Sequence, residues 1–201
     1  MRRPNDPDHQ LVRKFNQRHG IHEDIPYSTW PHYPTQTDNH SIVNIFVLDT
    51  DIERCAHYHC DQHVVKMILE SVQLMCTALN KKGFSTPYKS THSQHPCVLW
   101  VEQSWQNFCW LGDLTRALNA EYRYRFDKTV DHKSLPVLEA ISAHCFENHG
   151  LTEFAQAMPD AYKVAGDPVT AYRSFYLGEK MHFARWTARP TPDWIQDVQA
   201  R

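Results

Sequence analysis

The chain has 201 residues, 41% of them hydrophobic, and 21 basic against 23 acidic side chains give it a formal net charge of −2. This length supports one core-bearing domain and little more. The near-neutral charge excludes a protein that coats nucleic acid with its whole surface, so any such contact has to come from a local basic patch. No stretch approaches the roughly 20 apolar residues of a membrane span, and no apolar run follows the initial MRR. We therefore expect a cytoplasmic protein that has no membrane partner.

Residues 1–41 differ in composition from the rest of the chain. They contain five of the twelve prolines and five of the fourteen histidines, and few aliphatic residues. A segment of this kind buries too little apolar surface to order itself. We predict a flexible, disordered-like N-terminal arm over 1–41 and one folded domain over 42–201.

The folded domain opens with SIVNIFVLD (41–49), which is short, apolar and β-branched and predicts one strand or an extended entry segment. The segments after it have helical periodicity instead. Helices are expected over 61–79, 97–126 with a bend or break at Gly112, 135–146, 151–158 and 169–186, followed by an extended strap from Thr187. The fold class is therefore predicted as mainly α, a single helical domain with at most one short N-terminal strand or extended segment.

The stretch HYHCDQHVVKMILE (57–70) carries the most unusual polar row. At 100° per residue, His59, His63, Lys66 and Glu70 fall within about 60° of one another, nearly opposite the apolar stripe of the same helix. A solvated face with an ordinary Lys66–Glu70 pair is one interpretation. The other is a cleft to which several helices contribute polar groups.

A catalytic interpretation of the row centres on Lys66. A primary amine beside His63 and Glu70 has two neighbours that could tune or relay its proton. A buried lysine with a lowered pKa acts as a nucleophile or forms a Schiff base. Such chemistry suits attack at the anomeric carbon of a sugar, so His63, Lys66 and Glu70 are the candidate catalytic residues.

A metal site is an alternative use of the same stretch. His59 and His63 at i,i+4 could share one ion, with His57, Cys60 or Asp61 as the third ligand. The H-E-x-x-H glutamate is missing between them, and no C-x-x-C pair or E-x-x-H pair supports a metal elsewhere. We therefore predict no cofactor, and we keep His57, His59 and His63 as the ligand set of the metal alternative.

Three further segments supply candidate substrate-binding residues. The loop THSQHP (91–96) leads into a helix whose N-terminus attracts anions, although simple helix capping explains it equally well. EYRYRFDK (121–128) and AYRSFYLGEKMHFARW (171–186) mix cations with aromatic rings, as phosphate-and-base surfaces do. The candidates are His92, His95, Trp100, Glu121, Arg125, Tyr172, Arg173 and Lys180.

Several of these segments together resemble a family of small proteins encoded by tailed bacteriophages. The similarity rests on NIFVLDTD, HCDQHVVKMILE, THSQHP, EYRYRF, QAMPDAYK and AYRSFY in this order, and covers about residues 43–195. The resemblance implies a phage-encoded protein in the host cytoplasm and implies no particular reaction. A weaker likeness, at HPCVLW (95–100), is to small helical proteins labelled pyrimidine-dimer DNA glycosylases. Their strongly basic helix is replaced here by DQHVVKMILE.

These patterns leave three functional hypotheses. The first is an enzyme acting on a nucleobase or nucleotide, free or in DNA, by glycosylase- or transferase-like chemistry, with Arg125, Arg173 and Lys180 on phosphate and Trp100 or a tyrosine stacked on the base. The second is a non-enzymatic protein that sequesters a host protein or a nucleotide. The third is the metal-dependent enzyme described above.

Overall fold

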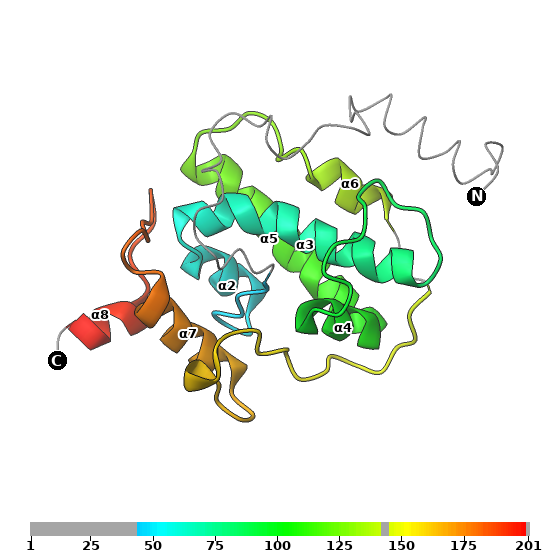
Figure 1. Cartoon of the computed structure of the whole chain (residues 1–201). Coiled ribbons are helices and arrows are strands. Elements are labelled where there is room, and N and C mark those ends of the chain that lie inside the picture. Colours follow the sequence, from blue (N-terminus) through cyan, green and yellow to red (C-terminus); the bar gives the residue numbers. More distant parts are fainter. Residues whose placement is uncertain (1–43, 142–144, 200–201) are drawn as a thin grey trace.

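The computed structural model describes residues 44–141 and 145–199, and the predicted arm (1–41) lies outside them (Figure 1). The described part of the chain is mainly helical, as predicted, and contains no strand. Its helices are α2 (Ile52–Tyr58), α3 (Asp61–Lys81), α4 (Pro96–Gln103), α5 (Trp105–Arg125), α6 (Leu135–Ala140), the 3-10 helix η2 (Asp160–Tyr162), α7 (Pro168–Glu179) and α8 (Asp193–Gln199).

Helices α3 and α5 form the centre of the fold and lie side by side (Figure 1). Helix α2 packs on α5, and α4 packs on both α3 and α5. The apolar stripe predicted for α3 is buried, as Ile68, Val72 and Met75 illustrate. The opposite, polar face is covered too, because His63 and Glu70 are also buried. Of the two interpretations of the polar row, this burial disagrees with the solvated face, although the Lys66 side chain is still 40% exposed.

The segment that precedes α2 covers part of this polar face. Residues 44–48 are buried and lie outside any helix or strand, so the described part of the 41–49 segment contains no strand. The Phe46 ring stacks on His63 with 4.4 Å between ring centroids, and it also contacts Phe175 of α7. The side-chain amide nitrogen of Asn44, Nδ2, donates to the carbonyl of Ala157 at 2.7 Å. This short segment thereby connects α3 with α7.

The helix expected over 97–126 is two helices, and the break comes at Ser104 instead of Gly112. Ser104 is extended (φ −153°) and its hydroxyl accepts from Gln106 N, which caps α5. Serine is a favoured capping residue because its side-chain oxygen replaces a missing helical acceptor. Gly112 lies inside unbroken α5, where an added Cβ would meet Met75 Cε of α3 at 3.6 Å.

Other boundaries also differ from the sequence expectation. The predicted 151–158 helix is absent, because its polar groups bond outward instead: Thr152 N donates to Asn107 Oδ1 and Ala157 N donates to the Tyr172 hydroxyl. Within 135–146 the described helix stops at Ala140, and Ile141 is extended. The 169–186 helix ends at Glu179.

The two remaining differences lie in short elements. Helix α2 was not expected from the sequence; it begins where Asp51 Oδ1 accepts from Arg54 N at 2.9 Å. The tail after Thr187 was expected to be an extended strap throughout, and it instead contains α8. No described helix is long and apolar enough to cross a membrane.

Candidate functional site

Lys66 and Glu70 form an ion pair on the covered face of α3. Lys66 Nζ lies 3.1 Å from Glu70 Oε1, and the two side chains differ sharply in exposure, 40% against 5%. The second carboxylate oxygen of Glu70 accepts from Asn44 N at 3.3 Å. Burial raises the pKa of Glu70 even though Lys66 and the Asn44 amide oppose the shift. The site thus contains a partly exposed amine, Lys66, that is ion-paired with a buried carboxyl group, Glu70.

Lys180 comes from the end of α7 and joins the same cluster. It is the C-cap residue of α7, and its Nζ lies 4.8 Å from the centroid of the Phe175 ring. Burial lowers the pKa of Lys180, and repulsion by the Lys66 ammonium lowers it further. Across the described residues the Lys180 amine has no ion pair or hydrogen bond. The structure therefore brings Lys66, Glu70 and Lys180 together, while leaving one of the two amines without a bonded anion.

His63 lies beneath the two lysines. Burial lowers the pKa of His63 well below its usual value, and the charges of His59, Lys180 and Lys66 add to the effect. Its Nδ1 is hydrogen-bonded to the hydroxyl of Tyr176, which also accepts from Cys60 N at 3.3 Å. A neutral, internally bonded ring of this kind orients its neighbours better than it transfers protons at neutral pH.

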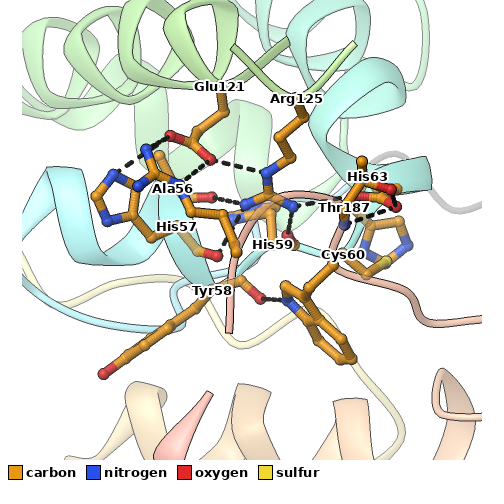
Figure 2. A network of polar contacts seen from close by, with 12 residues as sticks. Ala56, His57, Tyr58, His59, Cys60, His63, Glu121, Arg125 and Thr187 are labelled. Carbon is orange, nitrogen blue, oxygen red and sulfur yellow. Dashed lines mark hydrogen bonds and ion pairs between the residues drawn. The ribbon is translucent and has the colours of Figure 1, made fainter. Parts of the chain in front are cut away.

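Arg125 is at the centre of a separate buried network (Figure 2). Its side chain is 0% exposed, and its Nε donates to Glu121 Oε2 at 2.7 Å. The other guanidinium nitrogens donate to the carbonyls of His59 at 2.8 Å and His57 at 2.9 Å, at the C-terminal end of α2. These acceptors occupy the positions that a phosphate would need, so the structure gives Arg125 a structural role in joining α2 to α5.

Glu121 completes this network on its other side. Arg189 Nη2 donates to Glu121 Oε1 at 2.6 Å, and His57 Nε2 lies 3.3 Å from the same oxygen. Burial raises the pKa of Glu121, but the hydrogen bonds from Arg189 and Arg125 outweigh it and the net shift is downward. A carboxylate held by two guanidinium groups has no free lone pair facing solvent for a substrate.

Most of the other predicted substrate-binding residues have internal partners. Arg173 Nε donates to the Leu48 carbonyl at 2.8 Å, and Arg173 Nη2 lies 3.2 Å from Asp49 Oδ2. The Tyr172 hydroxyl is fully buried and donates to the Ala155 carbonyl at 2.8 Å. Trp100 is buried against Phe154. Tyr172 also donates to Asn44 Oδ1 at 2.9 Å, and Asn44 N donates to Glu70, so Tyr172 borders the lysine cluster from within the core. Arg173 and Trp100 have no contact with Lys66, Glu70 or Lys180 among the described residues.

The loop over 91–96 behaves as a helix cap. His95 Nδ1 accepts from Cys97 N at 3.2 Å, which is the capping interpretation of this loop. His92 is exposed and has a positive φ of 48°. Neither ring contacts the lysine cluster in the described part of the chain.

The three histidines of the metal alternative do not gather around one point. His57 faces Glu121, and His59 Nδ1 is hydrogen-bonded to the Cys55 carbonyl at 2.7 Å. The ring centroids of His59 and His63 are 6.5 Å apart. Across residues 44–141 and 145–199, no group of three or more His, Cys, Asp or Glu side chains is arranged to hold a metal ion.

A shallow open hollow of about 520 Å³ lies elsewhere, between α3 and α4. Lys81 Nζ and Glu102 Oε1 form a 2.8 Å ion pair in it. This hollow has the same residue types as the Lys66–Glu70 pair but lacks the buried carboxyl, the second amine and the neutral histidine. We therefore place the candidate site at the lysine cluster.

Sequence reasoning missed three members of the site: Asn44, Phe46 and Tyr176. In the sequence, Phe46 and Tyr176 look like ordinary core residues, and both are indeed buried. Their polar and stacking contacts with α3 join residues more than ten positions apart, which helical periodicity cannot reveal. Asn44 could have been noticed in the sequence, because it is the one polar residue in the apolar run IVNIFVL.

A comparison with protein-family models, with curated proteins and with solved structures found no match for this chain.

Proposed function

We propose that the protein is an enzyme acting on a nucleobase or nucleotide, free or within DNA, and that it breaks or exchanges the bond between base and sugar. The observation that carries the proposal is the joint placement of a buried carboxyl and two lysine amines: Glu70 and Lys66 on α3, and Lys180 at the end of α7. The resemblance to phage proteins and the likeness to small DNA glycosylases favour the same class of substrate.

Proton transfer to the departing base falls to Glu70. A carboxyl group whose pKa is raised by burial retains its proton closer to neutral pH than a solvated one does. A base leaves a sugar more readily when its nitrogen or oxygen is protonated, and a positioned acid typically contributes 10²–10⁴-fold to such a step. His63 is neutral and bonded to Tyr176, so its role is to position the cluster from below.

In this proposal the lysines of the cluster, and not the predicted arginines, attract the substrate phosphate. Arg125 and Arg173 were candidate phosphate ligands, but both donate to acceptors of the protein itself. The cluster contains two lysine amines and one carboxylate, and only Lys66 is in contact with that carboxylate, so the local excess is of basic groups, which favours a phosphate-bearing substrate.

The test is release of free base from defined substrates. The full chain would be incubated with nucleoside 5′-monophosphates and with oligonucleotides that contain normal bases, uracil or thymine dimers, and free base would be measured by chromatography with mass detection. We expect release from at least one substrate and a loss of at least about tenfold in Glu70→Gln. The matched control is Glu102→Gln, which alters a lysine-bound carboxylate outside the site and should leave the rate unchanged.

Two outcomes would count against the proposal. Absence of base release from every substrate, combined with tight binding of one of them, would favour the sequestering protein instead. Equal loss of activity in Glu70→Gln and Glu102→Gln would show that the buried carboxyl has no special part in the reaction.

A further inference from the structure

The two lysines of the candidate site differ in the groups that their amines contact. Lys66 Nζ is paired with Glu70 Oε1 at 3.1 Å. Lys180 is half-buried at the C-terminal end of α7, and no carboxylate of the described residues lies within ion-pair distance of it. Its amine instead lies over the face of Phe175, with 4.8 Å from Nζ to the ring centroid. The geometry thus separates a paired amine from an unpaired one.

We infer that Lys180, and not Lys66, is the nucleophilic amine of this protein, and that it forms covalent imines with the aldehyde carbon of a ring-opened sugar. The inference rests on the proposed function for its substrate class, but the amine chemistry itself can be tested without any turnover. It reassigns the nucleophile that the sequence suggested, since Lys66 is the lysine whose lone pair is least available.

The surroundings of Lys180 disfavour its charged form relative to that of a solvated lysine. An ammonium group is disfavoured by burial and by a second ammonium nearby, which is how enzymes activate a nucleophilic lysine. The charged and titratable groups that act on Lys180 are Lys66, Glu70, Glu179 and Cys60, while His63 lies beside both lysines and is neutral. Lys66 and burial lower its pKa, whereas the carboxylates of Glu179 and Glu70 raise it. The net shift of the pKa is downward.

The covalent step balances with the groups present. The lone pair of neutral Lys180 attacks the aldehyde carbon, and the carbonyl π electrons move to oxygen, which takes a proton to give a carbinolamine. Protonation of that hydroxyl by a buffer acid and its loss as water leave the imine. With a nucleotide, attack of the amine at C1′ breaks the glycosidic bond, and its electron pair leaves with the base. The base takes a proton from Glu70, which takes one back from the attached nitrogen. The nitrogen lone pair then breaks the bond from C1′ to the ring oxygen, which takes a proton from the buffer, and the ring-opened sugar is held as the same imine.

The experiment traps this imine on the full-length protein. 2-Deoxyribose 5-phosphate and sodium cyanoborohydride would be added at pH 7.5, so that hydride transfer converts the imine to a stable secondary amine, and peptide mass spectrometry would give the rate of modification at each lysine. The internal reference is Lys163, an exposed lysine paired with Asp160. We expect Lys180 to be modified at least about tenfold faster than Lys163, in line with a lowered pKa.

Two variants with opposite expected signs test the cause. Lys66→Met removes the neighbouring ammonium, so Lys180 should be modified more slowly, by roughly threefold or more. Glu70→Gln removes a carboxylate that favours the charged amine, so Lys180 should be modified faster. Mere accessibility would not reverse sign between the two variants. Circular dichroism melts would confirm that both are folded, and the wild-type ratio of Lys180 to Lys163 needs no variant at all.

Each result counts for or against the inference. Modification of Lys180 no faster than that of Lys163, or preferential modification of Lys66, would overturn it. Selective modification of Lys180 without base release from any nucleotide would support the inference and count against the proposed function. Base release that survives in Lys180→Arg, with the trapped adduct on Lys66, would support the function and overturn the inference.

Discussion

Two clusters of charged side chains lie along α3, and they differ in how their charge is balanced. Around Arg125, at the start of α3, every charged group is matched: the guanidinium donates to Glu121 and to carbonyls of α2, and Glu121 also accepts from Arg189 (Figure 2). Around Lys66, further along the helix, one amine is paired with Glu70, while the second amine, Lys180, has no ion pair among the described residues. A fully matched buried network holds elements together, whereas an unmatched charge is available to a ligand or a reaction.

Replacement of Arg125 should have the largest effect on stability. Arg125→Met leaves the carbonyls of His57 and His59 without their donor and removes one partner of buried Glu121. Breaking a buried ion pair in this way typically costs about 3–5 kcal/mol, so the free energy of unfolding in urea should fall by that amount. The control is Arg123→Met, two residues away with an exposed side chain, which should change it by less than about 0.5 kcal/mol. Similar losses in both variants would contradict the structural role of the network.

The pH dependence of stability should report the buried neutral histidines. Burial lowers the pKa of His59 and of His132 from 6.5 to about 4. Below about pH 6.5 the unfolded chain takes up these protons while the folded protein does not, so the free energy of unfolding should fall as the pH drops from 6.5 towards 4. Between pH 7 and pH 5 the loss should be roughly 1–2 kcal/mol for each histidine.

Variants separate this effect from other titrations. His132→Gln should reduce the slope of unfolding free energy against pH, whereas His149→Gln, at an exposed ring, should leave it unchanged. Glu70 acts in the opposite direction, because its pKa is raised: the stability it contributes is lost as the pH rises through its folded pKa. A slope that does not differ between wild type and His132→Gln would contradict the buried neutral state of His132.

Removal of the Tyr176 hydroxyl should have an intermediate effect. Tyr176→Phe leaves His63 Nδ1 and Cys60 N unpaired in a buried place, which should cost about 1–2 kcal/mol in urea unfolding. Tyr162→Phe is the matched control, because that hydroxyl donates to Glu179 at 2.7 Å near the surface, and its loss should leave the free energy of unfolding nearly unchanged. Equal costs would mean that the hydroxyl of Tyr176 is solvated in solution.

The sequence predicted these two clusters unequally. The helical row of His63, Lys66 and Glu70 could be predicted because its members lie on one helix and successive members are three or four residues apart. The Arg125 network could not, because its acceptors are backbone carbonyls of α2, a helix that the periodicity did not indicate. Arg125 was therefore expected on a substrate phosphate, since a sequence shows that an arginine is present but not which acceptors the fold supplies to it.

The same distinction explains the errors in the helices. The apolar stripe of α3 predicted that helix well, because a 3.6-residue period that continues over many residues is a strong signal. The break at Ser104 depends on a capping bond, and the loop over 151–158 depends on hydrogen bonds to Asn107 and Tyr172. Apolar spacing contains no information on such bonds, and tertiary contacts override it.

The smallest expected effect comes from the lysine–glutamate pair outside the site, and it tests whether burial is what distinguishes the two pairs. Lys81–Glu102 and Lys66–Glu70 have similar distances, 2.8 and 3.1 Å, but the Glu102 side chain is 21% exposed and that of Glu70 only 5%. Lys81→Met should therefore cost less than about 0.5 kcal/mol, because water replaces the lost partner of Glu102. Lys66→Met should cost about 1–3 kcal/mol, because Glu70 keeps only the bond from Asn44 N. Urea unfolding of the two variants side by side measures the difference, and equal costs would mean that Glu70 reaches solvent as freely as Glu102 does.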